Sequence, residues 1–247
     1  MRTATVDLKV ARSKLRFKLT VPDDATRKIE LLPLFRSLAD TIVDAAVDDA
    51  KASGYTISCT KGCGACCRQV VPISDVEADS IRQLVDALPE PRRSTVVERF
   101  ERARQTLADA GLLETLRESR RVPASEAEAL GIAYFRLGIP CPFLEDESCS
   151  IHAERPLACR EYLVTTPAAN CAQPTPDTIH CVPVPARVSR AIRRIDEDVP
   201  PHEEPWIPLV LALEWALPDD SARRSGTSMV ARALSFLTGK DVAEPDP

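Results

Sequence analysis

The chain has 247 residues, a length typical of one domain with appendages or of a main domain with a small second one. Hydrophobic residues make up 44% and aromatic residues 4%, so a core of this chain is built mainly from Leu, Val, Ile and Ala. The net charge of -5 comes from 37 acidic and 32 basic residues, a mixed balance that gives no electrostatic footprint for a nucleic-acid partner.

The first 23 residues have the pattern of a β-hairpin. Apolar residues alternate with polar ones in residues 6–10 and again in residues 15–21, with Ala-Arg-Ser between the two runs. Period two on both sides of a short connection is typical of paired antiparallel strands. The segment carries charges throughout and lacks the apolar core of a secretory signal. We therefore expect a cytoplasmic protein, in which thiols stay reduced.

Helical periodicity replaces this alternation further along the chain. Apolar side chains recur every third or fourth position in residues 30–50, 75–88 and 96–110. Ser74 and Glu77 have the spacing of a capping box at the start of the second of these helices. A second such pair, Ser125 and Glu128, predicts a further helix that ends near Gly138. The helices of residues 75–110 carry no residues that suggest chemistry, so we interpret them as scaffold.

The C-terminal third predicts three more helices. A basic amphipathic pattern covers about residues 186–195, and an acidic, proline-rich stretch separates it from helices near residues 206–217 and 220–238. The apolar run 206–217 is too short to span a bilayer and contains Pro208 and Glu214, so we expect a buried helix and no membrane partner. We expect residues 241–247 to fray.

All nine cysteines lie between residues 59 and 181, in two groups. The first group is Cys59, Cys63, Cys66 and Cys67; the second is Cys141, Cys149, Cys159, Cys171 and Cys181. A lone cysteine is usually an inert, buried hydrophobe, but four within nine residues indicate a metal site. Gly62 and Gly64 free the backbone to direct N–H groups at thiolates, and Lys61 and Arg68 offset their charge.

The kind of metal follows less directly from these residues. Neighbouring side chains usually diverge, so the Cys66–Cys67 pair suits a cluster of several irons better than one tetrahedral zinc ion. One zinc ion also takes four ligands and would leave half of the cysteines idle. The excess of thiols therefore favours an iron–sulfur cluster over zinc. A cluster with a second ion and a pair of adjacent metal centres stay open.

The second cysteine group predicts the other half of the same site. Pro140 and Pro142 hold Cys141 extended, and a turn in Leu-Glu-Asp-Glu-Ser brings Cys149 towards it. Pro156 fits the first turn of a short helix that carries Cys159. Arg155 and Arg160 could donate hydrogen bonds to sulfur or to the acidic turn, and a surface ion pair remains an alternative for Arg155. We expect the two groups to converge, since each alone offers incomplete coordination.

The two motifs C-TKG-C-GA-CC and CPFL-EDES-C-SI-H-AE-RP-LA-CR, in this order, resemble a known family over about residues 58–171. This is the YkgJ-type cysteine-cluster family, a zinc- or iron-chelating domain also found in flagellin lysine-N-methylase. The resemblance implies the ligands Cys59, Cys63, Cys66, Cys67, Cys141, Cys149 and Cys159, with Cys171 as the eighth. Such proteins often carry Tyr at position 152, so we expect His152 to pack. Whether His152, Cys171 or Cys181 is a ligand stays open.

The sequence predicts a mainly α (α+β) fold in three parts. These are an N-terminal β-hairpin (residues 1–23), a cysteine-cluster metal-binding domain (24–185) and a C-terminal helical extension (186–247). The favoured function is a metal-binding protein in which the metal serves folding, with a protein partner left unidentified. The alternative is a protein-modifying enzyme of the lysine-N-methylase type. It has no identified catalytic residue, because Tyr162 and Glu161 are each more typical of packing. A thiol oxidoreductase using Cys63 and Cys66 is not favoured, because no βαβ pattern surrounds them.

Overall fold

The structure, a computed structural model, describes residues 1–10, 13–175, 177–196, 204–215 and 224–239. In these residues helices dominate, and every sheet is a pair of short or medium antiparallel strands. The predicted mainly α fold with small β elements is therefore confirmed. The described residues contain no helix that is both long and apolar enough to cross a membrane.

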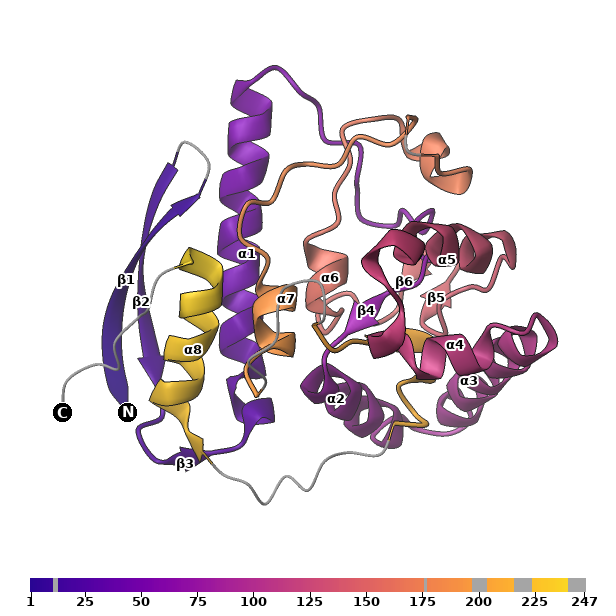
Figure 1. The fold of residues 1–247 in the computed structure, drawn as a ribbon, viewed down its shortest axis with the longest axis horizontal. Coiled ribbons are helices and arrows are strands. Elements are labelled where there is room, and N and C mark those ends of the chain that lie inside the picture. The colour runs from indigo at the N-terminus through magenta and orange to yellow at the C-terminus, as the bar shows by residue number, and fades with distance from the viewer. Residues whose placement is uncertain (11–12, 176, 197–203, 216–223, 240–247) are drawn as a thin grey trace.

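The predicted N-terminal hairpin is present. Strand β1 (Arg2–Val10) pairs with β2 (Ser13–Val21), with Arg2 opposite Val21. On β2 the side chains of Leu19 and Val21 are buried and Thr20 between them is exposed, as period two requires. The hairpin lies beside α1 (Lys28–Ala52) and α8 (Gly226–Thr238), and α8 lies between the strands and α1 in Figure 1.

Helix α1 is the central element of the first hydrophobic core. It covers the helix predicted for residues 30–50. One face buries nine apolar side chains, among them Leu31, Phe35 and Ile42. Helix α7 (Val188–Arg193) and α8 pack on this face. Strand β3 (Ala25–Thr26), just before α1, pairs with β8 (Arg224–Ser225), just before α8. We call this cluster the α1 core. It unites residues of all three predicted parts, whose boundaries stay a prediction.

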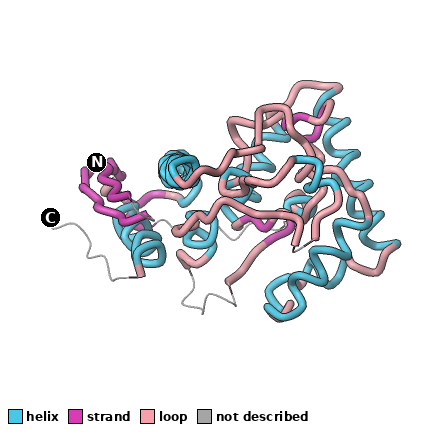
Figure 2. Tube along the Cα trace, turned by 90° about the horizontal axis from the view of Figure 1, so that it is seen from above, coloured by secondary structure: helices cyan, strands magenta, loops and turns pink. Residues whose placement is uncertain are grey.

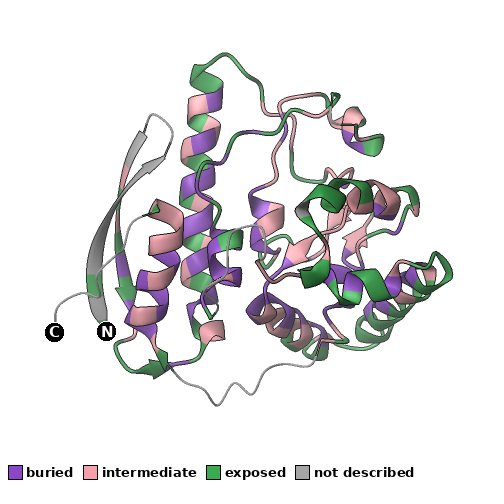
Figure 3. Cartoon of the chain, in the orientation of Figure 1, coloured by how far each residue is buried: buried purple, intermediate pink, exposed green. Residues whose placement is uncertain are grey.

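The second half of the molecule is built from shorter helices. These are α2 (Asp75–Asp86), α3 (Arg92–Asp109), α4 (Leu113–Arg117) and α5 (Ala124–Arg136), with a 3-10 turn at Ser119–Arg121. They enclose two smaller hydrophobic cores. Figure 2 shows these helices grouped on one side of the molecule and the hairpin on the other, and Figure 3 shows buried residues gathered where the elements meet.

One predicted capping box is confirmed and the other is wrong. The Glu77 backbone N–H donates to Ser74 Oγ at 3.3 Å, and the Ser74 backbone N–H donates to Glu77 Oε2 at 2.9 Å. Helix α5 instead begins at Ala124 after Pro123, so Ser125 lies inside the helix and makes no cap. Pro123, with its extended backbone, is the N-cap residue, so the helix begins two residues too early for Ser125 to cap it. Gly138, with φ 65°, follows the helix end as predicted.

The helix predicted at residues 206–217 is wrong. Ile207–Pro208 forms strand β7, which pairs with β4 (Pro72–Ile73), and a 3-10 turn follows at Leu209–Leu211. The segment is apolar because it is buried, and periodicity alone does not separate a buried strand from a buried helix. Helix α7 is shorter than the predicted 186–195. Helix α8 begins at Gly226 rather than 220, and residues 216–223 and 240–247, on which parts of these predictions fall, lie outside the described residues.

Candidate metal centre

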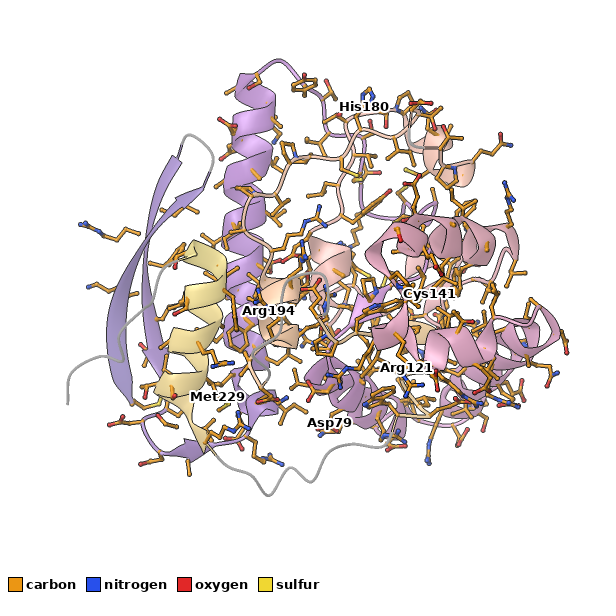
Figure 4. All side chains as sticks on the ribbon, viewed as in Figure 1. Asp79, Arg121, Cys141, His180, Arg194 and Met229 are labelled. Atoms are coloured by element: carbon orange, nitrogen blue, oxygen red, sulfur yellow. The ribbon has the colours of Figure 1, made fainter. Side chains whose placement is uncertain are left out.

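The two cysteine groups line one cavity of about 200 Å³, although 74 positions separate Cys67 from Cys141. Six thiols contribute to its wall: Cys63, Cys66, Cys67, Cys141, Cys149 and Cys159. The remainder is largely apolar and includes Val71, Phe143 and Ile151. Among its described lining residues, Arg155 and Arg187 are cationic and none is Asp or Glu. Figure 4 shows Cys141 within the crowded side chains beside α5.

The first cysteine loop is a series of tight turns rather than a regular element. The Cys63 N–H donates to Thr60 O and the Cys67 N–H to Gly64 O, at 3.1 and 2.9 Å. Gly62 has a φ of 88°, which an L side chain rarely adopts. Gly64 lies against the second loop, where an added Cβ would come within 2.7 Å of Glu147 O. The first glycine therefore allows a turn, and the second allows the two loops to touch.

The contact between the loops is made by backbone and by one ion pair. The Cys141 N–H donates to Cys67 O at 2.7 Å, which joins the two cysteine groups directly. Arg68 forms a bidentate pair with Glu147, with N–O distances of 3.0 and 2.6 Å. Arg68 therefore does not serve mainly to offset thiolate charge, as the sequence suggested. The acidic turn attracts it instead, because a carboxylate matches its two parallel N–H groups.

The second loop is the predicted hairpin. Strand β5 (Leu144–Glu145) pairs with β6 (Ser148–Cys149), and Asp146 and Glu147 form the turn with φ values of 49° and 55°. Left-handed residues at both turn positions match the twist of a tight hairpin. This turn folds the chain back, so that Cys149 and Cys141 both reach the cavity.

Helix α6 (Leu157–Arg160) carries Cys159 and is fixed by two buried charges. Glu77, the capping residue of α2, also accepts the Leu157 N–H at 2.7 Å. Arg160 donates to Asp40 on α1 at 2.8 and 2.9 Å and to two carbonyl groups before the helix. Arg160 is therefore a structural anchor rather than a donor to sulfur. Sequence reasoning missed the second role of Glu77, because a capping motif does not reveal its partner outside the helix.

Backbone N–H groups point at several of the sulfur atoms. Cys141 accepts from Phe143, Cys149 from Ile151 and Cys59 from Val164, the last at 3.3 Å. These bonds favour thiolate, yet burial outweighs them. Burial raises the pKa of Cys141 to about 12 and raises the pKa of Cys149 and Cys59. Such thiols keep their protons at neutral pH unless a cation replaces them.

The adjacent cysteines contradict one expectation. The side chains of Cys66 and Cys67 do not diverge but hydrogen-bond each other, and both line the cavity. The hydrogen bond to Cys67, followed by burial, raises the pKa of the Cys66 thiol. The tight turn closed by the Cys67 N–H keeps the pair on one side of the loop. Divergence of this pair therefore gives no reason to prefer a cluster to zinc.

The cavity wall contains an arginine, Arg155, with one unsatisfied nitrogen. Arg155 Nη1 lies 2.7 Å from His152 Nε2, but the buried Arg155 Nε has no hydrogen-bond partner among the described residues. The charge of Arg155 acts to lower the pKa of both Cys66 and Cys149. The sequence predicts that His152 packs, but the side chain is exposed and lines the cavity. Arg155 is therefore placed to donate to a thiolate or to an anionic centre between the loops.

The donor set fits a soft metal better than a hard one. Thiols surround the cavity without carboxylates in its described lining, and two arginines offer charge to a thiolate-bound centre, which is anionic. The thiols do not converge on a point: among the described residues, no three His, Cys, Asp or Glu side chains are grouped so as to hold a metal ion. The chemistry of the wall fits a thiolate-bound metal, whereas closure around it needs the thiols to turn inward.

Three cysteines lie outside the cavity wall. Cys59 and the buried Cys171 are predicted ligands, and Cys181 is exposed. Burial raises the pKa of Cys171 to about 11, and the thiols of Cys59, Cys66 and Cys63 add to the shift. Cys59 belongs to the first cysteine loop, and Val164, which donates to Cys59 Sγ, is bridged to Cys181.

Tyr162 and Glu161 have different surroundings. Glu161 is buried and accepts hydrogen bonds from the Ser189 N–H and hydroxyl at 3.0 and 2.5 Å, so it holds α7 in place. Tyr162 lines the cysteine cavity, and its hydroxyl accepts from Gln69 Nε2 at 3.2 Å. Tyr162 and Gln69 also line a neighbouring cavity of about 340 Å³. Phe135 and Ile132 on α5 enclose this second cavity on another side. Arg187 and Gln69 carry no signal in the sequence, because they lie outside the cysteine motifs.

Comparison with known families gives one match. Residues 58–176 match the family model CxxCxxCC, described as "Putative zinc- or iron-chelating domain". The match contains eight of the nine cysteines and the whole cysteine cavity except for Arg187 and Leu209. Comparison with curated proteins and with solved structures gives no match.

Proposed function

We propose that the protein holds an iron–sulfur cluster, or zinc, between its two cysteine groups, because residues 58–176 match the model of a zinc- or iron-chelating domain. The observation that carries this proposal is the cavity wall, in which six predicted ligands meet two arginines. The predicted ligands are Cys59, Cys63, Cys66, Cys67, Cys141, Cys149, Cys159 and Cys171.

The number of thiols supports a cluster over a single zinc ion. A structural zinc site is almost always tetrahedral with four ligands, whereas the wall alone provides six thiols. An iron–sulfur cluster spreads its bonds over several irons and uses backbone N–H and cationic donors to its sulfur atoms. The unpaired Arg155 Nε and the N–H groups aimed at Cys141 and Cys149 would serve such a centre.

The metal would act first on folding. The two loops contact each other through the Cys141–Cys67 backbone hydrogen bond, the close approach of Gly64 to Glu147 and one exposed ion pair. A metal that bonds to both groups closes this contact, so its binding free energy becomes folding free energy.

The test is anaerobic purification of the full-length protein, followed by visible absorption and analysis of metal and acid-labile sulfide. We expect broad visible absorption with iron and sulfide in stoichiometric amounts. A colourless protein with stoichiometric zinc would replace the cluster by zinc. Protein that retains no metal when iron and zinc are supplied would overturn the proposal.

A short variant series locates the site. Cys63→Ser and Cys159→Ser come from different groups, and each should lower metal content and melting temperature together if both groups bind one centre. Ala158→Ser is the matched control, because it adds a hydroxyl beside Cys159 without removing a thiol. Full metal retention in both cysteine variants would contradict a shared centre.

The enzyme alternative rests on the second cavity. Its wall shares Gln69 and Tyr162 with the cysteine cavity, so a substrate there would lie across one side chain from the metal. A protein-modifying enzyme of the lysine-N-methylase type predicts that Tyr162→Phe abolishes activity and leaves metal content and fold intact. Equal loss of metal in Tyr162→Phe would assign Tyr162 to the structure of the site instead.

A further inference from the structure

A further cavity, of about 150 Å³, lies where the α1 core meets the two smaller cores. Its wall is formed by the start of α2, the end of α7, the turn at Ser119–Arg121 and the segment 205–215. None of its described lining residues belongs to the cysteine cavity or to the cavity beside it. Most of them lie beyond residue 176, where the family match ends. The metal centre therefore leaves this cavity unexplained.

Both tryptophans of the chain, Trp206 and Trp215, line this cavity, and we call it the tryptophan cavity. Each is half-buried, and Ile207 adds a buried apolar side chain to the wall. Arg82 fixes the backbone at Trp215, since its guanidinium donates to Leu213 O and Trp215 O at 2.8 and 2.7 Å. Indole rings form rigid walls that suit planar, aromatic ligands. A cavity of about 150 Å³ is large enough for one benzene ring.

The acidic side chains of the wall are already paired. Asp75 and Asp196 both form ion pairs with Lys28 of α1. Asp196 also accepts from Arg224 through its other oxygen, at 2.8 Å. The other oxygen of Asp75 accepts the Val76 N–H at 2.8 Å. Two cations thus balance the two carboxylates, which leaves little negative charge to attract a cationic ligand.

Arg193 is the buried cation of the wall. Its side chain is 5% exposed and donates from Nη1 to Pro72 O at 3.2 Å, which joins α7 to β4 (Figure 1). Its Nη2 donates to Glu204 Oε1 at 2.7 Å, an oxygen that Arg190 shares at 2.9 Å. The buried Arg193 Nε and Glu204 Oε2 have no hydrogen-bond partner among the described residues, so the two side chains do not form a bidentate pair. Arg193 therefore keeps one strong donor unused.

Arg160 shows what a purely structural arginine does in the same molecule. It is similarly buried, but all of its nitrogens donate: Nε to Arg155 O, Nη1 to Asp40 and Nη2 to a further carbonyl group. A buried donor of a charged group is costly to leave unpaired, because it has lost its water. Structural anchoring alone therefore does not account for Arg193 Nε, whereas an acceptor on a ligand does.

We propose that the tryptophan cavity binds a small aromatic carboxylate with a ring the size of benzene. The ring would lie against Trp206 and Trp215, and the carboxylate would accept the Arg193 Nε–H. Arg120 adds a second cation to the wall. A carboxylate suits this wall better than a neutral acceptor, because hydrogen bonds between charged groups are shorter and about twice as strong.

The test is a titration of the full-length protein with para-fluorobenzoate, followed by fluorine NMR and by tryptophan emission. We expect saturable binding that changes the emission, because both tryptophans form the wall. The cation para-fluorobenzylammonium and the neutral para-fluorotoluene have rings of the same size, and each should bind at least about tenfold more weakly. Absence of saturable binding of the carboxylate at millimolar concentration, or equal affinity for the cation, would overturn the proposal.

Variants locate the carboxylate within the wall. Arg193→Lys keeps a charge beside Glu204 and removes the Nε donor, so it should weaken binding by about tenfold or more. The matched control is Arg190→Lys, on the same helix and paired with the same carboxylate but outside the wall, which should bind as the wild type does. Equal weakening in both would overturn the proposal.

Trp215→Leu tests the ring contact independently, because it keeps an apolar side chain and removes the indole. It should also weaken binding, and circular dichroism shows whether each variant is folded. Unchanged affinity in either folded variant, Arg193→Lys or Trp215→Leu, would overturn the proposal.

A last control concerns the cysteine cavity, whose arginines would also attract an anion. Arg155 does not line the tryptophan cavity, so Arg155→Lys should leave the affinity for para-fluorobenzoate unchanged. Weakening in Arg155→Lys without weakening in Arg193→Lys would place the anion in the cysteine cavity and overturn the proposal. Such a failure would leave the proposed metal centre standing, because the two cavities share no described lining residue.

Discussion

The α1 core and the cysteine loops show two different ways of stabilising a fold. Helix α1 buries nine apolar residues on one face and packs against the hairpin, α7 and α8. In the first cysteine loop, residues 57–69, the one fully buried position is Gly64. The hydrophobic effect scales with the apolar area removed from water, so it can stabilise the α1 core but not the first cysteine loop. The second region needs bonds of another kind.

Magnitudes support this contrast. Each fully buried Leu, Ile or Phe contributes about 1.5–3 kcal/mol, so the apolar face of α1 is stable without a cofactor. Structural zinc in small peptides contributes about 10–16 kcal/mol of apparent binding free energy. The comparison therefore predicts that the cysteine half depends on metal and the α1 core does not.

Metal removal should have the largest effect. Treatment with a chelator under reducing conditions removes about 4 kcal/mol if the metal is present at a thousand times its dissociation constant, which corresponds to a melting temperature lower by roughly 10 °C. Both tryptophans, Trp206 and Trp215, pack in the two smaller cores, so tryptophan fluorescence reports on the cysteine half.

Hydrogen exchange shows which regions lose stability when the metal is removed. Amides of residues 58–69 and 141–160 should exchange much faster after metal removal, whereas amides of residues 31–46 on α1 should change less. Equal acceleration in both regions would break the comparison, because it would show one cooperative unit. No change in either would mean that the loops hold their form without metal.

Acid should weaken metal binding steeply. Burial raises the pKa of Cys141 to about 12 and raises the pKa of Cys159, so both thiols are protonated at neutral pH without metal. Binding releases these protons, and a lower pH therefore favours the metal-free form. With two or more protons released, the affinity should fall by at least about 100-fold per pH unit between about pH 8 and 6. An affinity that does not vary with pH would exclude these buried thiols as ligands.

The sequence predicts much of this arrangement, and its failures have physical causes. The hairpin, α1 and the Ser74 capping box follow from local periodicity and capping chemistry, which do not depend on distant residues. The strand Ile207–Pro208 depends on pairing with Pro72–Ile73, far away in the chain, so the local pattern of residues 206–217 does not predict it. The approach of the cysteine groups followed from incomplete coordination, whereas the Val164 bridge to Cys181 carries no local signal.

A small cavity in the α1 core should affect stability alone. Ile42 is fully buried on α1, and Ile42→Val removes one methylene at a cost of about 0.5–1.5 kcal/mol. The melting temperature should fall by about 2–5 °C with no change in metal per folded molecule. The exposed substitution Asp44→Asn on the same helix is the control. Loss of metal in Ile42→Val would show that the core also positions the thiols, and metal analysis beside calorimetry measures both quantities.

The smallest effect is expected at the ion pair that joins the two cysteine loops. Arg68 and Glu147 are bidentate, but their side chains are 32% and 60% exposed, so water and salt screen the attraction. Glu147→Gln should therefore lower the melting temperature by no more than about 2 °C, and less at high salt. Glu118→Gln, which removes an exposed pair with Arg121, is the matched control. Metal content should stay the same in both variants. If Glu147→Gln released the metal while Glu118→Gln did not, surface charge would be what holds the loops together, and the assignment of that role to the thiols would be wrong.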